Sequence, residues 1–76
     1  MKPEVLLSRI RVVLCRPSHP GNIGAAARAM KTMGLSRLYL VEPRQFPDPE
    51  ADTRATGAVD VLAEARVVSS LKDALV

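Results

Sequence analysis

Hydrophobic and polar positions along the 76-residue chain predict alternating strands and helices. Residues 10–15 form a short apolar run rich in β-branched side chains, which is typical of a strand buried on both faces of a parallel sheet. Residues 38–41 have the same character, and residues 66–68 predict a weaker third strand. Residues 16–20 and 42–47 are predicted loops, because each of their prolines disfavours helix at the residue before it.

Between the first two strands, an amphipathic pattern predicts a helix that begins near Gly21 or Asn22 and runs to Met33. Gly34 follows it at the position where a left-handed residue commonly ends a helix. Apolar residues recur at the spacing of a buried helix face, namely at Ile23, Ala26, Ala27 and Met30.

Three further short helices are predicted after the second strand. Asp48 is the expected N-cap of the first, which Gly57 ends. Asp60 is expected to cap a second helix over residues 61–65, and Ser70 to open the last one. The order β-α-β-α-α-β-α predicts an α/β fold, with an open, Rossmann-like parallel sheet and flanking helices.

Composition limits the classes of protein to which the chain can belong. Eleven Lys and Arg against eight Asp and Glu give a charge of +3, which permits an RNA or phosphate partner without requiring one. Cys15 is the single cysteine, so we exclude a disulfide framework and expect a small buried residue in a reducing, cytoplasmic protein. We expect no membrane partner, because no apolar run approaches membrane-spanning length. We also expect no metal, because the acidic residues of the second half fit helix caps and surface charges; these are Asp48, Glu50, Asp52 and Asp60.

The stretch from Gly21 to Gly24 has the form of a phosphate-binding helix start, because free N–H groups and a positive dipole lie there. It matches neither the dinucleotide fingerprint nor a Walker loop. A helix start that is simply packed beneath a loop explains the same residues. The stretch alone therefore leaves both interpretations open.

Arg28 is more informative, because it lies roughly 140° from Ile23 on a helical wheel, opposite the buried face. It shares a row with Gly21, Gly24 and Ala25, whose small size leaves room for a ribose-phosphate or for a second backbone. A solvated surface arginine and a subunit contact are the alternatives.

Four segments of the chain resemble one family, and these are residues 11–14, 17–35, 38–43 and 55–62. The resemblance is to the SPOUT-class RNA 2′-O-ribose methyltransferases, nearest to the bacterial tRNA (cytidine/uridine) type. It implies that residues 1–76 are the N-terminal part of one α/β-knot domain, inactive alone, with the knot-forming second half absent. For the intact protein it implies a cytoplasmic homodimer that methylates RNA, most readily tRNA, with S-adenosylmethionine as cofactor.

The resemblance also implies roles for particular residues. Asn22 and Arg28 match the catalytic positions of the family motif, and cofactor-binding residues are expected beyond Val76. The expected RNA-binding residues are Ser18, His19, Gly21, Gly24 and Lys31. Local sequence gives His19 a place in the loop but no chemical role. A small non-catalytic RNA-binding, phosphate-binding or dimerisation module is the alternative function.

Overall fold

Three strands, β1 (Arg11–Cys15), β2 (Arg37–Val41) and β3 (Arg66–Val68), form the sheet in the computed structural model, which describes residues 9–76. They lie in the order β1-β2-β3, and both pairings are parallel, as the sequence predicts. Val13 on β1 is opposite Tyr39 on β2. Parallel pairing requires a crossover between successive strands, and the helices supply it.

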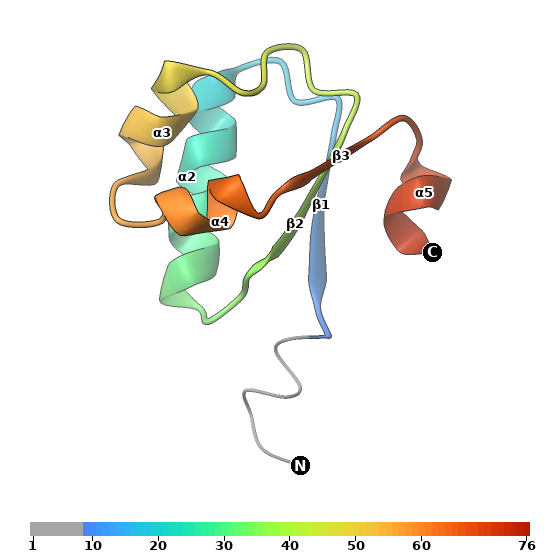
Figure 1. Cartoon of the computed structure of the whole chain (residues 1–76), viewed down its shortest axis with the longest axis horizontal. Coiled ribbons are helices and arrows are strands. Elements are labelled where there is room, and N and C mark those ends of the chain that lie inside the picture. The colour runs from blue at the N-terminus through green and yellow to red at the C-terminus, as the bar shows by residue number, and fades with distance from the viewer. Residues whose placement is uncertain (1–8) are drawn as a thin grey trace.

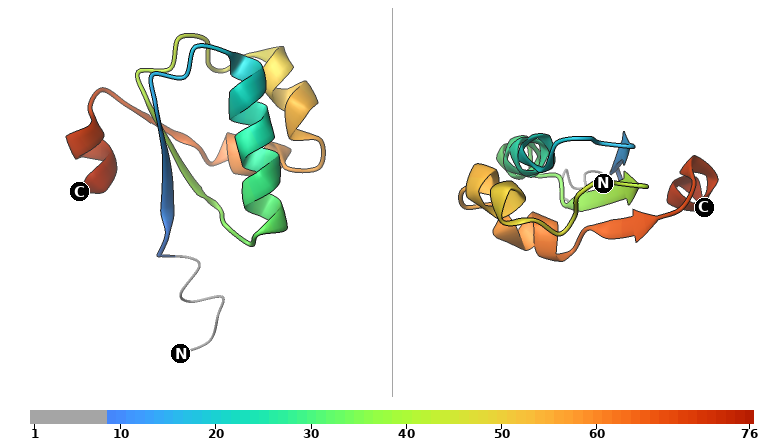
Figure 2. Two further views of the ribbon diagram at one scale, coloured as in Figure 1. Left: turned by 180° about the vertical axis from the view of Figure 1, so that it is seen from behind. Right: turned by 90° about the horizontal axis from the view of Figure 1, so that it is seen from above.

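Helices cover both faces of this sheet, and Figure 1 shows them on either side of the strands. They are α2 (Pro20–Thr32), α3 (Pro49–Ala55), α4 (Val59–Ala63) and α5 (Leu71–Leu75). The first three of these gather on one side of the strands, and α5 lies on the other (Figure 2). The predicted α/β class and element order are therefore confirmed.

Two apolar clusters correspond to the two faces. The larger cluster packs α2, α3 and α4 against β2, and the smaller one packs Ala74 of α5 against Tyr39 and Val41. Four large side chains of the larger cluster are almost wholly buried, namely Ile23, Met30, Leu38 and Leu40. The predicted inner face of α2 is thus confirmed at Ile23, Ala27 and Met30.

The ends of α2 follow local sequence chemistry. Pro20 opens the helix one residue before the predicted start, because its fixed φ suits the first helical position. Gly34 has a φ of 78°, and the Leu35 N–H donates to the Met30 carbonyl over 2.8 Å. This is the Schellman ending that the glycine predicted.

The predicted cap of α4 is wrong. Ala58 is the N-cap, the helix begins at Val59, and Asp60 lies inside its first turn. The Asp60 carboxylate instead accepts a hydrogen bond of 2.7 Å from Lys31 on α2. A tertiary ion pair has therefore replaced the local capping interaction on which the prediction relied.

The predictions of a β1 buried on both faces and of a buried Cys15 are also wrong. Residues 11–14 are half-buried and Cys15 is exposed, because β1 lies at one edge of the described sheet. The strand with the predicted burial is β2, which has neighbours on both sides.

The expected domain covers residues 1–76, and its first eight residues lie outside the described part. Within residues 9–76, no helix has both the length and the apolar character needed to cross a bilayer.

Candidate functional site

The amino end of α2 presents an uncapped helix start to solvent. His19 is its N-cap residue but makes no side-chain capping bond, and no acidic residue lies in the first turn. Ser18, His19 and Asn22 are all exposed. Pro20 has no N–H group, and the Asn22 N–H donates to the His19 carbonyl over 3.1 Å. What this helix start offers an anion is therefore the positive end of the dipole and the exposed polar side chains, with the Glu50 carboxylate of α3 beside Gly21.

Backbone hydrogen bonds fix the loop that leads to this helix. The Arg16 N–H donates to the Val41 carbonyl over 2.7 Å, and the Arg44 N–H donates to the Pro17 carbonyl over 3.1 Å. Arg16 and Glu42 each follow a strand and have φ values of 51° and 46°. The loop before α2 is therefore tied to the loop before α3, and both leave the carboxyl edge of the sheet.

Arg28 lies on the outer face of α2 and is exposed, as predicted. Asn22 is also exposed, but the two are six residues apart, which in a helix means about 9 Å along the axis and about 120° around it. The two motif side chains thus flank a region of the helix surface instead of touching each other. A ligand that contacts both must extend along nearly two turns of the helix, from the first turn to the third.

Gly24 is buried against α3, although it shares a row with Arg28. A Cβ atom at Gly24 would lie 2.8 Å from Cβ of Arg54 and 3.0 Å from the carbonyl carbon of Ala51. The missing side chain therefore lets α3 approach α2. An RNA contact at Gly24 stays a prediction, and what the structure shows at this residue is helix packing.

Lys31 lies on another side of α2 and is already paired. Its Nζ donates to Asp60 Oδ2 over 2.7 Å, and this hydrogen bond lowers the pKa of the Asp60 carboxyl. The pair connects α2 to α4. The predicted RNA contact of Lys31 would have to compete with it.

A groove of about 460 Å³ runs along the outer face of α2. Arg28 from α2 and Arg54 from α3 both line it. The other lining residues are Ala25, Ala29, Thr32 and Met33. Arg54 is not predictable as a site residue from the sequence, because no local pattern shows that α3 packs beside α2.

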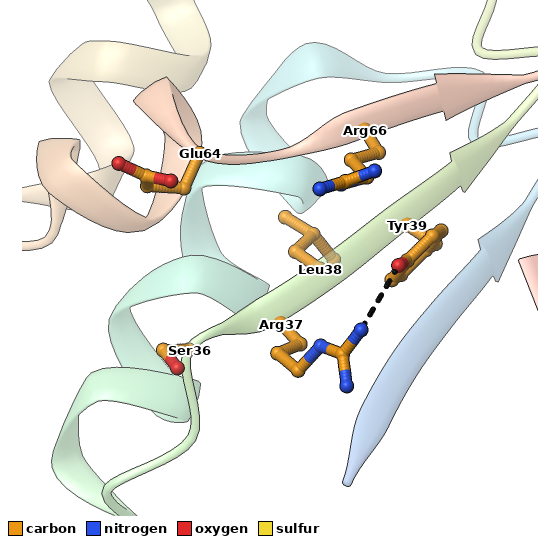
Figure 3. A pocket seen from close by; sticks show the side chains of 6 residues that line it. All are labelled: Ser36, Arg37, Leu38, Tyr39, Glu64 and Arg66. Carbon is orange, nitrogen blue, oxygen red and sulfur yellow. Dashed lines mark hydrogen bonds between the residues drawn. The ribbon is translucent and has the colours of Figure 1, made fainter. Parts of the chain in front are cut away.

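A second cavity, of about 300 Å³, lies at the amino ends of β2 and β3 (Figure 3). Arg37 donates a hydrogen bond of 3.3 Å to the Tyr39 hydroxyl, which lowers the pKa of that phenol. Arg11 stacks over the Tyr39 ring at 5.2 Å and donates to the carbonyls of Ala74 and Val76. Two of the arginines around Tyr39 thus serve the packing of the fold, so this cavity is a weaker candidate than the α2 groove.

The residues at the carboxyl edge do not form a site for S-adenosylmethionine. A cavity of about 390 Å³ lies there, but its charged side chains, Arg16 and Glu42, pair with each other at 3.7 Å and are 81% and 55% exposed. A cofactor of this size needs an enclosed pocket that buries most of its surface. Within residues 9–76, no three His, Cys, Asp or Glu side chains gather as a metal-binding group.

The chain is similar to known proteins in both sequence and structure. The chain is 63% identical over 70 residues to the tRNA (cytidine/uridine/adenosine-2′-O-)-methyltransferase TrmJ of Pseudomonas aeruginosa. These aligned residues cover 92% of the chain and 27% of that protein. The solved structure of a "probable methylase family protein" from Haemophilus influenzae matches with a TM-score of 0.89 and 48% identity, over 92% of the chain and 29% of its own. TrmJ from Z. mobilis matches with a TM-score of 0.79 and 48% identity, over 82% of the chain and 28% of its own.

The chain thus spans less than a third of the length of these relatives. A profile of the SpoU rRNA methylase family matches residues 9–76, which include the amino end of α2, Arg28 and the groove. The chain belongs to the SpoU rRNA methylase family.

Proposed function

We propose that the whole protein transfers a methyl group to the 2′-hydroxyl of a ribose in RNA, with tRNA as the substrate. The observation that carries the proposal is the position of Arg28, exposed in a groove on the outer face of α2. The relatives named as tRNA 2′-O-methyltransferases support the choice of tRNA.

Within this proposal, the first three turns of α2 hold the RNA backbone. The positive end of the helix dipole attracts a phosphate, and the exposed side chains of Ser18, His19 and Asn22 supply the polar contacts. The small Gly21 leaves room for the RNA backbone at this end of the helix, Gly24 contributes by letting α3 pack close to α2, and Lys31 would contribute from another side of the helix. Asn22 acts beside the reacting ribose.

Arg28 acts through its charge and not as a base. A guanidinium keeps its proton at neutral pH, so it cannot accept the proton of the 2′-hydroxyl. It stabilises the negative charge that develops on that oxygen and binds the adjacent phosphate. The proposal therefore assigns Arg28 a role in turnover beyond that of substrate affinity.

Three further parts of the proposal follow from the family resemblance. The methyl donor is S-adenosylmethionine, held by residues beyond Val76. The working form is a cytoplasmic homodimer. Residues 1–76 form the N-terminal part of one SPOUT domain and supply the RNA side of its site.

The decisive experiment measures methyl transfer from labelled S-adenosylmethionine to unmodified tRNA transcripts by the full-length protein. Arg28→Ala should lower kcat by about 100-fold or more, the usual effect of removing a transition-state hydrogen-bond donor. The matched control is Arg66→Ala, which removes another exposed arginine from the amino end of β3 and should leave kcat unchanged. Full activity in the Arg28 variant would remove the role given to this residue.

The alternative is a protein that binds RNA without catalysis. The +3 charge and the uncapped helix start favour it. Steeply salt-dependent binding of RNA, with no methyl transfer to any transcript, would support this alternative over the methyltransferase.

A further inference from the structure

Two arginines that are distant in the sequence line the same groove. Arg28 comes from the third turn of α2, and Arg54 from the last turn of α3. The two helices lie side by side in both views (Figures 1 and 2). Gly24 makes this possible, because its missing side chain lets the Cβ atom of Arg54 come within 2.8 Å of the position that a Cβ would occupy.

Neither guanidinium is neutralised by the described part of the chain. The ion pairs among residues 9–76 are Arg16 with Glu42 and Lys31 with Asp60, and no hydrogen bond there involves the side chain of Arg28 or of Arg54. Both residues are exposed. Two like charges that share a groove repel each other, and an anion between or beside them relieves that repulsion.

The floor of the groove suits a narrow, charged ligand. Ala25 and Ala29 also line the groove and are exposed, and their small side chains leave room for a ligand. The Thr32 hydroxyl is already used, because it donates to the Arg28 carbonyl over 3.1 Å. The guanidinium groups are therefore the main polar side-chain donors that this groove offers.

A second copy of the chain fits the groove less well. A twofold interface centred here would place the same patch on both subunits, and it would bring both copies of Arg28 and Arg54 together. The charge complementarity favours a polyanion instead.

We propose that Arg54 is a second RNA-binding residue, which binds a phosphodiester neighbouring the one that Arg28 engages. Two guanidiniums along one groove would hold two points of the RNA backbone and so fix the strand direction at the target ribose. The choice of RNA as the polyanion rests on the proposed function. Arg54 contributes to the affinity for RNA and to the position of the RNA strand along the groove. Arg28 contributes to these and also to the chemical step.

The test compares Arg54→Ala with Arg66→Ala in the full-length protein. Binding of an unmodified tRNA transcript is followed by fluorescence anisotropy at several salt concentrations, and kcat and KM for tRNA are measured. Arg54→Ala should raise Kd by about tenfold. The slope of log K against log salt concentration should fall by about one, as expected for one lost phosphate contact. Its kcat/KM should fall by about as much as its affinity, whereas the control Arg66→Ala should keep the wild-type Kd, salt slope and kcat.

Arg54→Lys and Arg54→Gln complete the series. Lysine keeps the positive charge but lacks the planar guanidinium group that can form two parallel hydrogen bonds to a phosphate. The RNA affinity of Arg54→Lys should therefore lie between those of the wild type and the alanine variant. Glutamine keeps most of the stem and should behave like alanine. Thermal unfolding of each variant shows whether the fold is intact.

Each possible result decides the proposal. An unchanged Kd and salt slope in Arg54→Ala overturns it, while the loss of turnover in Arg28→Ala leaves the proposed function in place. Sedimentation that shows a dimer dissociated by Arg54→Ala overturns it in favour of a subunit contact. A protein that binds tRNA without methylating it contradicts the proposed function alone, because the affinity of Arg54→Ala still reports on Arg54. A wild-type protein that does not bind RNA overturns both.

Discussion

Gly24 shows how one residue places the candidate site. In the sequence it is one of several small residues near Arg28, and a surface open to RNA was the natural interpretation. In the structure it is the point where α3 packs on α2, with the Ala51 backbone and Arg54 directly against it. The identity of this residue therefore determines which side chains of α3 reach the groove.

Gly24→Ala should destabilise the chain by about 2 kcal/mol, because overpacking against a backbone carbonyl exceeds the gain in helix propensity. Gly21→Ala is the matched control in the same helix. Its nearest neighbour would be Glu50 Oε1 at 3.2 Å, the end of a flexible side chain that can move away. Urea unfolding should show the loss at residue 24 and almost none at residue 21. Equal effects at the two glycines would contradict the packing role.

Tyr39 provides a spectroscopic test of the sheet surface, because it is the only tyrosine and the chain has no tryptophan. The hydrogen bond from Arg37, helped by the charges of Arg11 and Arg66, lowers the pKa of its phenol. A lowered native pKa adds stability as the pH rises toward the unfolded value of about 10, because the unfolded chain keeps the proton longer. Arg37→Met should move the phenolate absorbance titration of the 76-residue chain to higher pH. A midpoint that does not move would show that this hydrogen bond is not formed in solution.

At the scale of elements, the sequence predicts what local chemistry controls. The alternation of apolar runs and turns predicts every strand and helix. Gly34 marks a helix end through its backbone, and Ser70 marks a helix start through its hydroxyl, which accepts from the Asp73 N–H. The failures arise where distant segments meet. Asp60 pairs with Lys31 instead of capping α4, and Cys15 is exposed because its strand lies at an edge. Periodicity carries no information about these pairings.

The candidate site divides in the same way. Arg28 and Asn22 can be named as candidate site residues from the sequence, because both lie in one helix and that helix resembles a family motif. Arg54 is not, because its position depends on the packing of α3 across Gly24. A helical wheel of α3 gives the face on which Arg54 lies, but it does not show that this face borders the groove on α2.

Helix α5 is attached to the sheet through Arg11. The guanidinium donates to the carbonyls of Ala74 and Val76, at 3.0 and 2.8 Å, and stacks over the Tyr39 ring. Arg11→Met should therefore cost about 1–2 kcal/mol in urea unfolding and speed hydrogen exchange of the α5 amides. The control Arg66→Met changes an exposed arginine on β3 and should leave both unchanged. Unaltered exchange in the Arg11 variant would mean that apolar packing alone holds α5.

At the scale of the molecule, the two candidate ligands make different demands on this chain. The groups proposed to face RNA lie close together, because Arg28 and Arg54 line one groove and the stem of Arg54 also lies beside Gly21 at the helix start. A cofactor requires an enclosed pocket, and the carboxyl edge of the described sheet offers an open cavity whose charged side chains are paired and exposed. The chain also spans only 27–29% of the length of its curated relatives. We therefore expect the two binding activities to separate.

Calorimetry with S-adenosylmethionine tests this separation. The full-length protein should bind the cofactor with a measurable heat, whereas the 76-residue chain should show little or none, because the open cavity leaves most of the ligand in water. The same 76-residue chain should still bind a tRNA transcript weakly and with a salt-dependent Kd, since its phosphate-binding groups are its own. Arg28→Ala in this chain should weaken that binding, and Arg66→Ala should not. Tight binding of S-adenosylmethionine to the 76 residues would show that they contain a cofactor site and that the proposed division between the two parts is wrong.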